Sequence, residues 1–429
     1  MTAPVSEEAC EPSREREVGK VPHRARHLSR RALLGALGAT GAAGAVAAVA
    51  VSRSARSTDT GRARGLPTEQ AERGGAGRTE GRLVYLGSFG AGITVARYDT
   101  GSGGLTAVGS FDGVANPSYL ALAPSGRVLY ALDEQRDGTV RALAIGDRGA
   151  LRPLGQARST GGDSPTHLSV HPGGRHLLTA NYGSGSVAVH TIGADGALGE
   201  RTDLVRHHGS GPDPERQRGP HAHQVLPDPQ GRFVLAVDLG TDTVHSYRLD
   251  PARGRLEPVA EARTAPGAGP RHLAFHPGGR FAYLVGELDS TVTVAAYDPA
   301  HGRLRFGDSL ATLPDGTEPG ERNYPAGVAV SSDGRFVYVS NRGHDSVARF
   351  AVADGGARLR LLDTVPCGGS YPRYLGLSGS GRLLFTGNQR SGTVAVFRVD
   401  RGSGELTAAG EPFAATAPVC VLPPPDEGH

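Results

Sequence analysis

An all-β fold of seven similar sheets, arranged as a β-propeller, is predicted by three features of the sequence. A stretch made of a Gly-Arg pair, a short apolar run and closing polar residues recurs seven times, at intervals of 45 to 57 residues. Each copy is flanked by further short segments with strand character. After residue 80 no long segment places apolar residues at helical spacing. Self-similarity at a period near 50 is typical of propellers.

The recurring stretch is the expected second strand of each blade. It is read most plainly as GRFVYVSNR from Gly334. Its Gly-Arg pair forms the turn that enters the strand, because glycine accepts turn conformations at little cost. The seven copies begin at Gly81, Gly126, Gly174, Gly231, Gly279, Gly334 and Gly381.

Three further strands are expected around each copy. A short segment opened by a proline precedes the turn, and proline is tolerated at the first residue of a strand. A third strand follows the polar residues, as in 242–249, and a fourth follows a glycine, as in 255–263. The opening prolines are Pro117, Pro165, Pro220, Pro270, Pro325 and Pro372.

The first copy has no proline-opened strand before it, and the C-terminal segment 417–422 has the missing pattern. We therefore expect this segment to complete blade 1, which closes the ring and leaves no long inner edge exposed. The predicted propeller spans residues 81–424, and 425–429 form a short tail.

The N-terminal 50 residues have the organisation of an export signal. A charged region ends in Arg30-Arg31, an apolar run covers 32–50, and small residues close it. The paired arginines resemble a twin-arginine signal, so the protein is expected to be exported, as a secreted or cell-envelope protein. The alternative is a membrane anchor, since 19 apolar residues could span a bilayer. Residues 51–80 have no periodicity and are predicted to be a disordered linker.

Charge and cysteine content narrow the possible partners. The formal net charge is +3, but residues 1–80 carry 13 Lys/Arg against 9 Asp/Glu, so the propeller itself is close to neutral. The absence of a basic stripe there argues against nucleic acid. Cys367 and Cys420 fall in different blades and are expected to be buried thiols. We expect a monomer that binds a small molecule, with no membrane contact beyond the signal.

The functional residues are expected where the inner and second strands of each blade meet, at the open end of their hairpin. The turn at the other end is always Gly-Arg, whereas this end varies, which is typical of a site carried on a scaffold. The alternative is that polar strand ends simply face solvent. The residues after the prolines are Ser118, Thr166, His221, Arg271, Ala326, Arg373 and Val419, with His167, His223 and His272 just beyond them. The second strands end in Glu134, Asn181, Tyr182, Asp238, Glu287, Asn341, Arg342, Asn388 and Gln389.

These residue types favour binding of an anion together with acid–base chemistry. Three arginines, Arg271, Arg342 and Arg373, can hold a carboxylate or phosphate through paired hydrogen bonds. Glu287, in preference to Glu134, could act as general base or acid, and activation of water by the pair of His221 and His223 is the alternative. His221 and His223 alternate along one strand, and Asp238 could orient one of them. A metal at this His-x-His pair is an alternative, but no second pair or cysteine accompanies it, so no metal or cofactor is expected. Ser88 and Ser340 have no nucleophile-elbow context.

Several short motifs together resemble the propeller-type 6-phosphogluconolactonase family, which also contains carboxymuconate-lactonising enzymes. The motifs stand in order as Ala-Asn-Tyr (180–182), Glu-Arg-Gln (215–217), Pro-His-Ala-His (220–223), Asp-Leu-Gly (238–240), Gly-Pro-Arg-His (269–272), Phe-His-Pro (275–277), Glu-Leu (287–288) and Ser-Asn-Arg (340–342). The resemblance covers residues 81 to about 424. It implies a seven-bladed propeller that acts on lactone rings.

The resemblance also implies roles for individual residues. Lactonising members of the family use a His, two Arg and a Glu, which fall here on His221 or His223, Arg271, Arg342 and Glu287. The expected function is hydrolysis of a sugar or related acidic lactone. The alternatives are a lactonising cyclase and an exported propeller that only binds a partner. Further residues expected to contact substrate are Glu134, Asn181, Arg216, Asp238, His272, Arg373 and Asn388.

Overall fold

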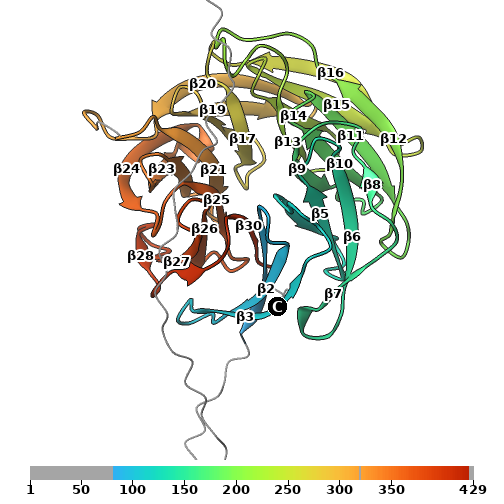
Figure 1. Cartoon of the computed structure of the whole chain (residues 1–429). Coiled ribbons are helices and arrows are strands. Elements are labelled where there is room, and N and C mark those ends of the chain that lie inside the picture. Colours follow the sequence, from blue (N-terminus) through green and yellow to red (C-terminus); the bar gives the residue numbers. More distant parts are fainter. Residues whose placement is uncertain (1–80, 318–319, 425–429) are drawn as a thin grey trace, which may run out of the picture. The chain divides into compact units, whose positions relative to one another are not determined.

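The computed structural model describes residues 81–317 and 320–424. The predicted export signal, linker and C-terminal tail lie outside the described residues. Figure 1 shows seven antiparallel sheets set around a common centre, and each sheet has its innermost strand nearest to that centre. Apart from the strands, the described part holds two short 3₁₀ turns, η1 (Asp147–Gly149) and η2 (Asp354–Gly356). The predicted seven-bladed all-β propeller is confirmed. None of its helical segments could cross a membrane.

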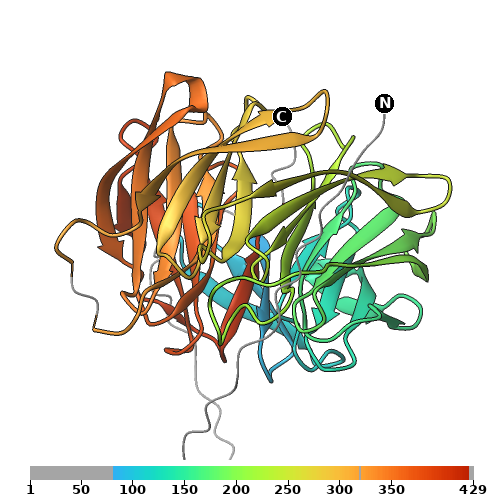
Figure 2. The ribbon, with the colours of Figure 1, turned by 90° about the horizontal axis from the view of Figure 1, so that it is seen from above.

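Blade 1 is built from both ends of the described chain. Its innermost strand is the C-terminal β30 (Pro418–Leu422), which pairs antiparallel with β1 (Arg82–Ser88). In Figure 2 this red strand stands beside the blue strands of blade 1. The predicted closure of the ring is therefore confirmed. Outside β1 lie β2 (Ile93–Tyr98) and β3 (Leu105–Phe111).

The other blades follow in chain order from the innermost strand outward, except that the outer strands of blades 2 and 7 are each divided into two pieces. Blade 2 consists of β4 (Leu120–Leu122), β5 (Val128–Asp133), β6 (Thr139–Ile145), β7 (Leu151–Pro153) and β8 (Arg158–Ser159). Blade 3 consists of β9 (Pro165–Val170), β10 (His176–Asn181), β11 (Ser186–Ile192) and β12 (Leu198–Arg206). Blade 4 consists of β13 (Ala222–Pro227), β14 (Val234–Asp238), β15 (Thr243–Asp250) and β16 (Arg255–Arg263).

Blades 5 to 7 complete the ring. Blade 5 consists of β17 (Pro270–Phe275), β18 (Phe281–Gly286), β19 (Thr291–Asp298) and β20 (Arg303–Ala311). Blade 6 consists of β21 (Tyr324–Val330), β22 (Phe336–Arg342), β23 (Ser346–Ala353) and β24 (Arg358–Pro366). Blade 7 consists of β25 (Pro372–Leu377), β26 (Leu383–Asn388), β27 (Thr393–Val399), β28 (Leu406–Ala408) and β29 (Phe413–Ala414).

The backbone conformation of the turn explains why the Gly-Arg pair recurs. In six of the seven copies the turn glycine has a φ between +65° and +73°. This left-handed conformation is unfavourable for residues with a Cβ atom, so the turn selects glycine in blade after blade. The Gly-Arg end is therefore scaffold, as predicted.

Neighbouring blades are joined by apolar clusters and by a recurrent tyrosine. Leu178 of β10 and Val234 of β14, for example, belong to one buried cluster between blades 3 and 4. The second-strand tyrosines Tyr130, Tyr283 and Tyr338 donate hydrogen bonds of 2.8 to 3.1 Å to glycine carbonyls of the following blade. Each buried hydroxyl thereby gains the partner that burial demands.

The inner strands enter their sheets in a common register in five blades, and blades 2 and 4 are the exceptions. In blade 2, β4 begins at Leu120, so the interpretation that Pro117 opens this strand is wrong. The opening proline pairs with the last residue of the second strand in most blades, as Pro270 pairs with Gly286. In blade 4 that position is taken by Ala222, which pairs with Asp238. Pro220 therefore stands two residues earlier than its counterparts. The interpretation that Pro220 opens the strand is wrong, and His223 is the residue equivalent to Arg271.

Candidate active site

At the end of a second strand, adjacent residues have different roles: one is buried in the scaffold, and the next faces a pocket. Three asparagines at the ends of second strands are fully buried, and each donates to a carbonyl just after the outer strand of the preceding blade: Asn181 to Thr160, Asn341 to Thr312 and Asn388 to Cys367. Each also donates to a Ser or Thr hydroxyl five residues later, at 3.1 to 3.4 Å. The residue after this position points the other way, because successive side chains in extended chain alternate.

The residues that follow the strand ends gather in one pocket with inner-strand residues. We call this cavity of about 350 Å³ the arginine pocket. Four of its residues follow or end second strands: Glu134, Tyr182, Glu287 and Arg342. The others are Thr166, Arg216, His223, Tyr324, Tyr371 and Arg373. The prediction that the two sets of residues meet is confirmed for these side chains.

Glu287 is at the centre of the pocket's charges. Its Oε1 lies 2.7 Å from Nη2 of Arg216, and its Oε2 lies 2.7 Å from Nη2 of Arg342 and 3.0 Å from Nε of Arg271. Burial opposes ionisation of this carboxyl, whose side chain is only 4 % exposed. The three guanidinium groups outweigh burial and hold the pKa of Glu287 well below its usual range. Glu287 is therefore a permanent anion and a weak base.

Backbone carbonyls fix two of these arginines. Arg271 donates from Nη1 to the carbonyl of Ala326 at 2.8 Å. Arg342 donates from Nε to the carbonyl of Tyr324 at 2.9 Å. Burial and the neighbouring arginines lower the pKa of Arg271 well below its usual value. Fixed guanidinium groups that are crowded in this way favour the arrival of a further anion.

Arg216 reaches Glu287 from the loop between β12 and β13. The Asp213 carboxylate accepts the backbone N–H of Arg216 at 2.9 Å. The next residue, Gln217, is fully buried and donates to the carbonyl of Leu239 at 2.8 Å and to Oδ1 of Asp242 at 2.7 Å. The loop is thus anchored on both sides of Arg216, whose side chain is still 32 % exposed.

Tyrosines border the arginine pocket. The Tyr182 hydroxyl accepts a hydrogen bond from Arg216 at 3.2 Å. Tyr324 has the guanidinium of Arg216 5.9 Å from its ring centre, and Tyr371 has that of Arg342 at 5.4 Å. These distances allow cation–π attraction, which further holds the guanidinium planes. Tyr371 adopts a φ of +63°, a strained conformation for a tyrosine.

Glu134 is the second carboxyl group of the site, and Arg373 is the cation that acts on it most strongly. Burial raises the pKa of Glu134, and Arg373 and Arg271 offset only part of this effect. The Oε2 atom of Glu134 is buried and has no hydrogen-bond partner among the described residues. The two carboxylates of the pocket therefore differ: Glu287 is held ionised, whereas Glu134 binds a proton more readily than an exposed glutamate does.

The histidines near the site are neutral. Burial, with Arg271 next in importance, lowers the pKa of His223 and of His272 well below the usual value. His223 lines the arginine pocket. His221 does not: its ring stacks on Tyr182 with 4.5 Å between the ring centres, and its Nδ1 lies 2.9 Å from the Tyr182 carbonyl. His223 is the member of the predicted pair that can meet a ligand there.

Four residues predicted to contact substrate lie outside the pocket: His272, and three residues with buried structural roles. Asn181 and Asn388 have the buried structural role described above. Asp238 is also fully buried, and its Oδ1 accepts the backbone N–H of His221 at 2.9 Å. Its Oδ2 pairs with Nδ1 of His207 at 2.6 Å. Asp238 thus holds the backbone of His221, and the imidazole it contacts is that of His207.

Among the described residues, the His221/His223 pair is not part of a cluster of side chains close enough to bind a metal ion together. The group of three such side chains in the described part of the chain is His207, Asp238 and His245. It does not line the arginine pocket. Both nitrogens of His207 already have partners, since its Nε2 lies 3.0 Å from the Tyr247 hydroxyl.

Tyr324 and Tyr371 belong to the pocket and were not among the predicted site residues. Each stands directly before a strand-opening proline, in Tyr324-Pro325 and Tyr371-Pro372. This shared Tyr-Pro pair is the signal that could have identified them. Of the other predicted residues, Arg216, Glu134 and Arg373 line the pocket, and His272 lies beyond it.

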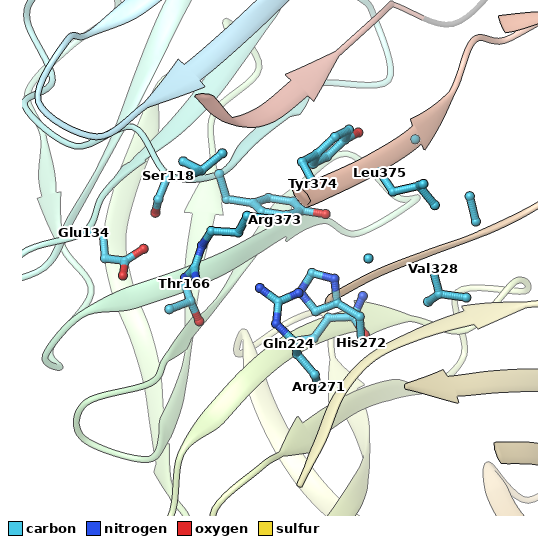
Figure 3. A pocket seen from close by; sticks show the side chains of 15 residues that line it. Ser118, Glu134, Thr166, Gln224, Arg271, His272, Val328, Arg373, Tyr374 and Leu375 are labelled. Carbon is cyan, nitrogen blue, oxygen red and sulfur yellow. The ribbon is translucent and has the colours of Figure 1, made fainter. Parts of the chain in front are cut away.

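A second cavity continues from the arginine pocket along the inner strands. We call this space of about 250 Å³ the inner chamber. Glu134, Thr166 and Arg373 line both cavities and so form the boundary between them. Figure 3 shows Glu134, Arg373, Arg271 and His272 around the chamber. Its wall also includes Ser118, Tyr119, Gln224, Val328, Tyr374 and Val419.

Comparison with known proteins places this architecture. Residues 83–423 match the family described as lactonase, seven-bladed β-propeller. The chain is 33 % identical over 309 residues to the 6-phosphogluconolactonase of Bacillus subtilis, covering 72 % of this chain and 87 % of that protein. It is 36 % identical over 266 residues to the 6-phosphogluconolactonase of Pectobacterium carotovorum, covering 62 % and 75 %. The structure of the periplasmic gluconolactonase of Pseudomonas aeruginosa aligns with a TM-score of 0.74 at 32 % identity, covering 79 % and 98 %.

Proposed function

Because this chain belongs to the lactonase family of seven-bladed β-propellers, we propose that it hydrolyses a sugar lactone or a related acidic lactone in the arginine pocket. The observation that carries the proposal is the Glu287 cluster. One buried carboxylate fixes three guanidinium groups, two of which, those of Arg216 and Arg342, line the pocket together with Arg373. Relatives named as 6-phosphogluconolactonases and a gluconolactonase support the substrate class.

The reaction adds water to the lactone carbonyl and opens the ring. Attack of water on the carbonyl carbon places negative charge on the carbonyl oxygen, and Arg342 and Arg373 are the donors that stabilise it. The bond from the carbonyl carbon to the ring oxygen then breaks. The ring oxygen takes up a proton, and the product is the open-chain hydroxy acid. Arg216, the most exposed of the cluster, contacts the substrate's outer polar groups.

We assign the general base to Glu134 and give Glu287 the role of organising the arginines. A base whose pKa lies far below neutrality accepts a proton poorly, so Glu287 is a weak candidate. Glu134 has a raised pKa and an unpartnered Oε2 at the boundary of the two cavities. It would accept a proton from the attacking water and return it to the ring oxygen. His223, neutral and buried, remains available as a hydrogen-bond partner.

A side-by-side assay tests the proposal. Purified protein is given 6-phosphogluconolactone, gluconolactone and carboxymuconate, and release of acid is compared with formation of a lactone. Hydrolysis of either sugar lactone above the spontaneous rate supports the proposal. Lactone formation from carboxymuconate alone would make the protein a cyclase, and inactivity towards all three would favour a binding propeller.

We also propose that the protein is exported, and this proposal rests on the N-terminal export signal. Arg30-Arg31 stands before the apolar run at 32–50, and one structural relative is a periplasmic gluconolactonase. Replacing both arginines by lysine is expected to retain the protein inside the cell. Fractionation of cells that express the full chain measures this, and unchanged export of the double variant would contradict it.

A further inference from the structure

The inner chamber contains buried polar atoms without partners. Among the described residues, Oε2 of Glu134 and Nε2 of His272 are buried and make no hydrogen bond. Both residues line the chamber. Leaving a buried polar group without a partner is unfavourable, so such atoms normally bind ordered water.

The chamber has the size and chemistry that ordered water requires. Its 250 Å³ offers room for several molecules, since one water occupies about 30 Å³ in the liquid. Hydroxyl, carboxylate, imidazole and guanidinium groups stand around one space, as Figure 3 shows. A bound water needs two to four polar partners, and this wall provides them.

Glu134 connects this space to the reaction. It lines the chamber and the arginine pocket, as do Thr166 and Arg373. A lactone held by the arginine cluster fills the pocket on one side of this boundary and limits access of solvent from that side. A water on the chamber side can then bond to Glu134 while facing the carbonyl carbon.

From this arrangement we propose that the inner chamber supplies the hydrolytic water, which approaches the lactone from the side opposite to the arginine pocket's opening. This inference rests on the proposed lactonase function. The water gives one proton to Oε2 of Glu134 as its oxygen bonds to the carbonyl carbon. The proton then passes to the ring oxygen as the ring bond breaks, so Glu134 ends as it began. Another water from the chamber replaces the one consumed.

Filling the chamber without touching its charged groups tests the proposal. Val328 of β21 lines the chamber and is partly buried. We expect Val328→Phe to lower kcat at least tenfold, while KM and the inhibition constant of the product gluconate stay within about threefold. A loss confined to kcat would show that substrate still binds and that the attacking water is what is missing.

A matched control comes from the same strand. Val330 is also partly buried and packs against the same apolar cluster as Val328, but it does not line the chamber. Val330→Phe should keep kcat within about twofold of the wild type. Melting temperatures of both variants report any damage to packing. If Val328→Phe does not fold, Ser118→Ala is the second variant: it removes one water partner, and we expect kcat to fall about threefold or more with KM unchanged.

The outcomes separate the two proposals. An active wild type with a folded Val328→Phe variant that keeps its kcat would overturn the water supply and leave the lactonase function intact. The same holds for an unimpaired Ser118→Ala variant where Val328→Phe cannot be folded. A wild type that hydrolyses no lactone would overturn the proposed function, and the water supply with it.

Discussion

Two glutamates line the arginine pocket, and their surroundings give them opposite properties. Glu287 contacts three guanidinium groups within 3.0 Å, which hold its pKa below the usual range. Glu134 has a raised pKa because burial outweighs the influence of Arg373. The same side chain can therefore organise cations at one position and exchange protons at another. What decides between these roles is the balance of neighbouring charge against burial.

Loss of the Glu287 charge should have the largest effect. Glu287→Gln leaves Arg216, Arg271 and Arg342 without their shared anion, so their guanidinium groups repel one another. We expect kcat/KM to fall by about 10³-fold or more, since even one misplaced oxyanion donor costs about 10²–10³. Because a buried charge then lacks its partner, the free energy of unfolding should fall by about 3–5 kcal/mol. Lactone hydrolysis and urea unfolding measure the two losses, and a fully stable, active variant would refute the organising role.

Loss of the Glu134 charge should affect turnover alone. Glu134→Gln keeps the shape of the side chain but removes its ability to accept a proton. A positioned general base contributes about 10²–10⁴-fold, so kcat should fall within that range. Stability should stay the same or rise slightly, because a poorly compensated buried charge is removed. Steady-state kinetics with a thermal melt measures both, and an unchanged kcat would exclude Glu134 as the base.

The pH dependence of kcat/KM also distinguishes Glu134 from Glu287. As pH falls through the pKa of Glu134, the base becomes protonated and kcat/KM decreases. Since burial raises this pKa, the acid limb should lie above the range of an ordinary glutamate, and it should be absent from the residual activity of Glu134→Gln. Glu287 should contribute no limb there, because its low pKa keeps it ionised. An acid limb that persists unchanged in Glu134→Gln would assign the titrating group elsewhere.

The smallest effect on catalysis is expected at Asn388, a predicted substrate contact that lies outside the pocket. Asn388 bonds to the Cys367 carbonyl and the Thr393 hydroxyl. Asn388→Ala should lower the free energy of unfolding by about 1–3 kcal/mol, because buried partners lose their hydrogen bonds. Its kcat/KM should stay within about threefold of the wild type. A large loss of activity without a loss of stability would place Asn388 in the site after all.

Much of this molecule could be predicted from periodicity. The Gly-Arg turn recurs because six of the seven blades need the same left-handed backbone conformation there. The repeat and the closing strand could therefore be read directly from the sequence. The site was harder, since residues at adjacent positions face opposite ways. Asn181 and Tyr182 are neighbours in sequence, yet Asn181 makes buried structural hydrogen bonds and Tyr182 lines the pocket. The recurring Asn with Ser or Thr five residues later marks the scaffold position, and it was available in the sequence.

Other features depend on three-dimensional context that a repeat does not encode. The two-residue offset of Pro220 is visible in the strand register, where Ala222 pairs with Asp238. That offset decides which histidine reaches the pocket. Likewise, the preference for Glu287 as the base rested on the family resemblance, whereas the difference between Glu287 and Glu134 depends on how many guanidinium groups surround each.

Chemical rescue tests the assignment of the two glutamates most directly. Glu134→Ala and Glu287→Ala are assayed for gluconolactone hydrolysis with increasing formate, a small carboxylate that can replace a missing base. We predict that formate restores part of the kcat of Glu134→Ala in a saturable manner and restores none of that of Glu287→Ala, because one free anion cannot realign three guanidinium groups. Rescue of Glu287→Ala, with Glu134→Ala unresponsive, would contradict the account and make Glu287 the base.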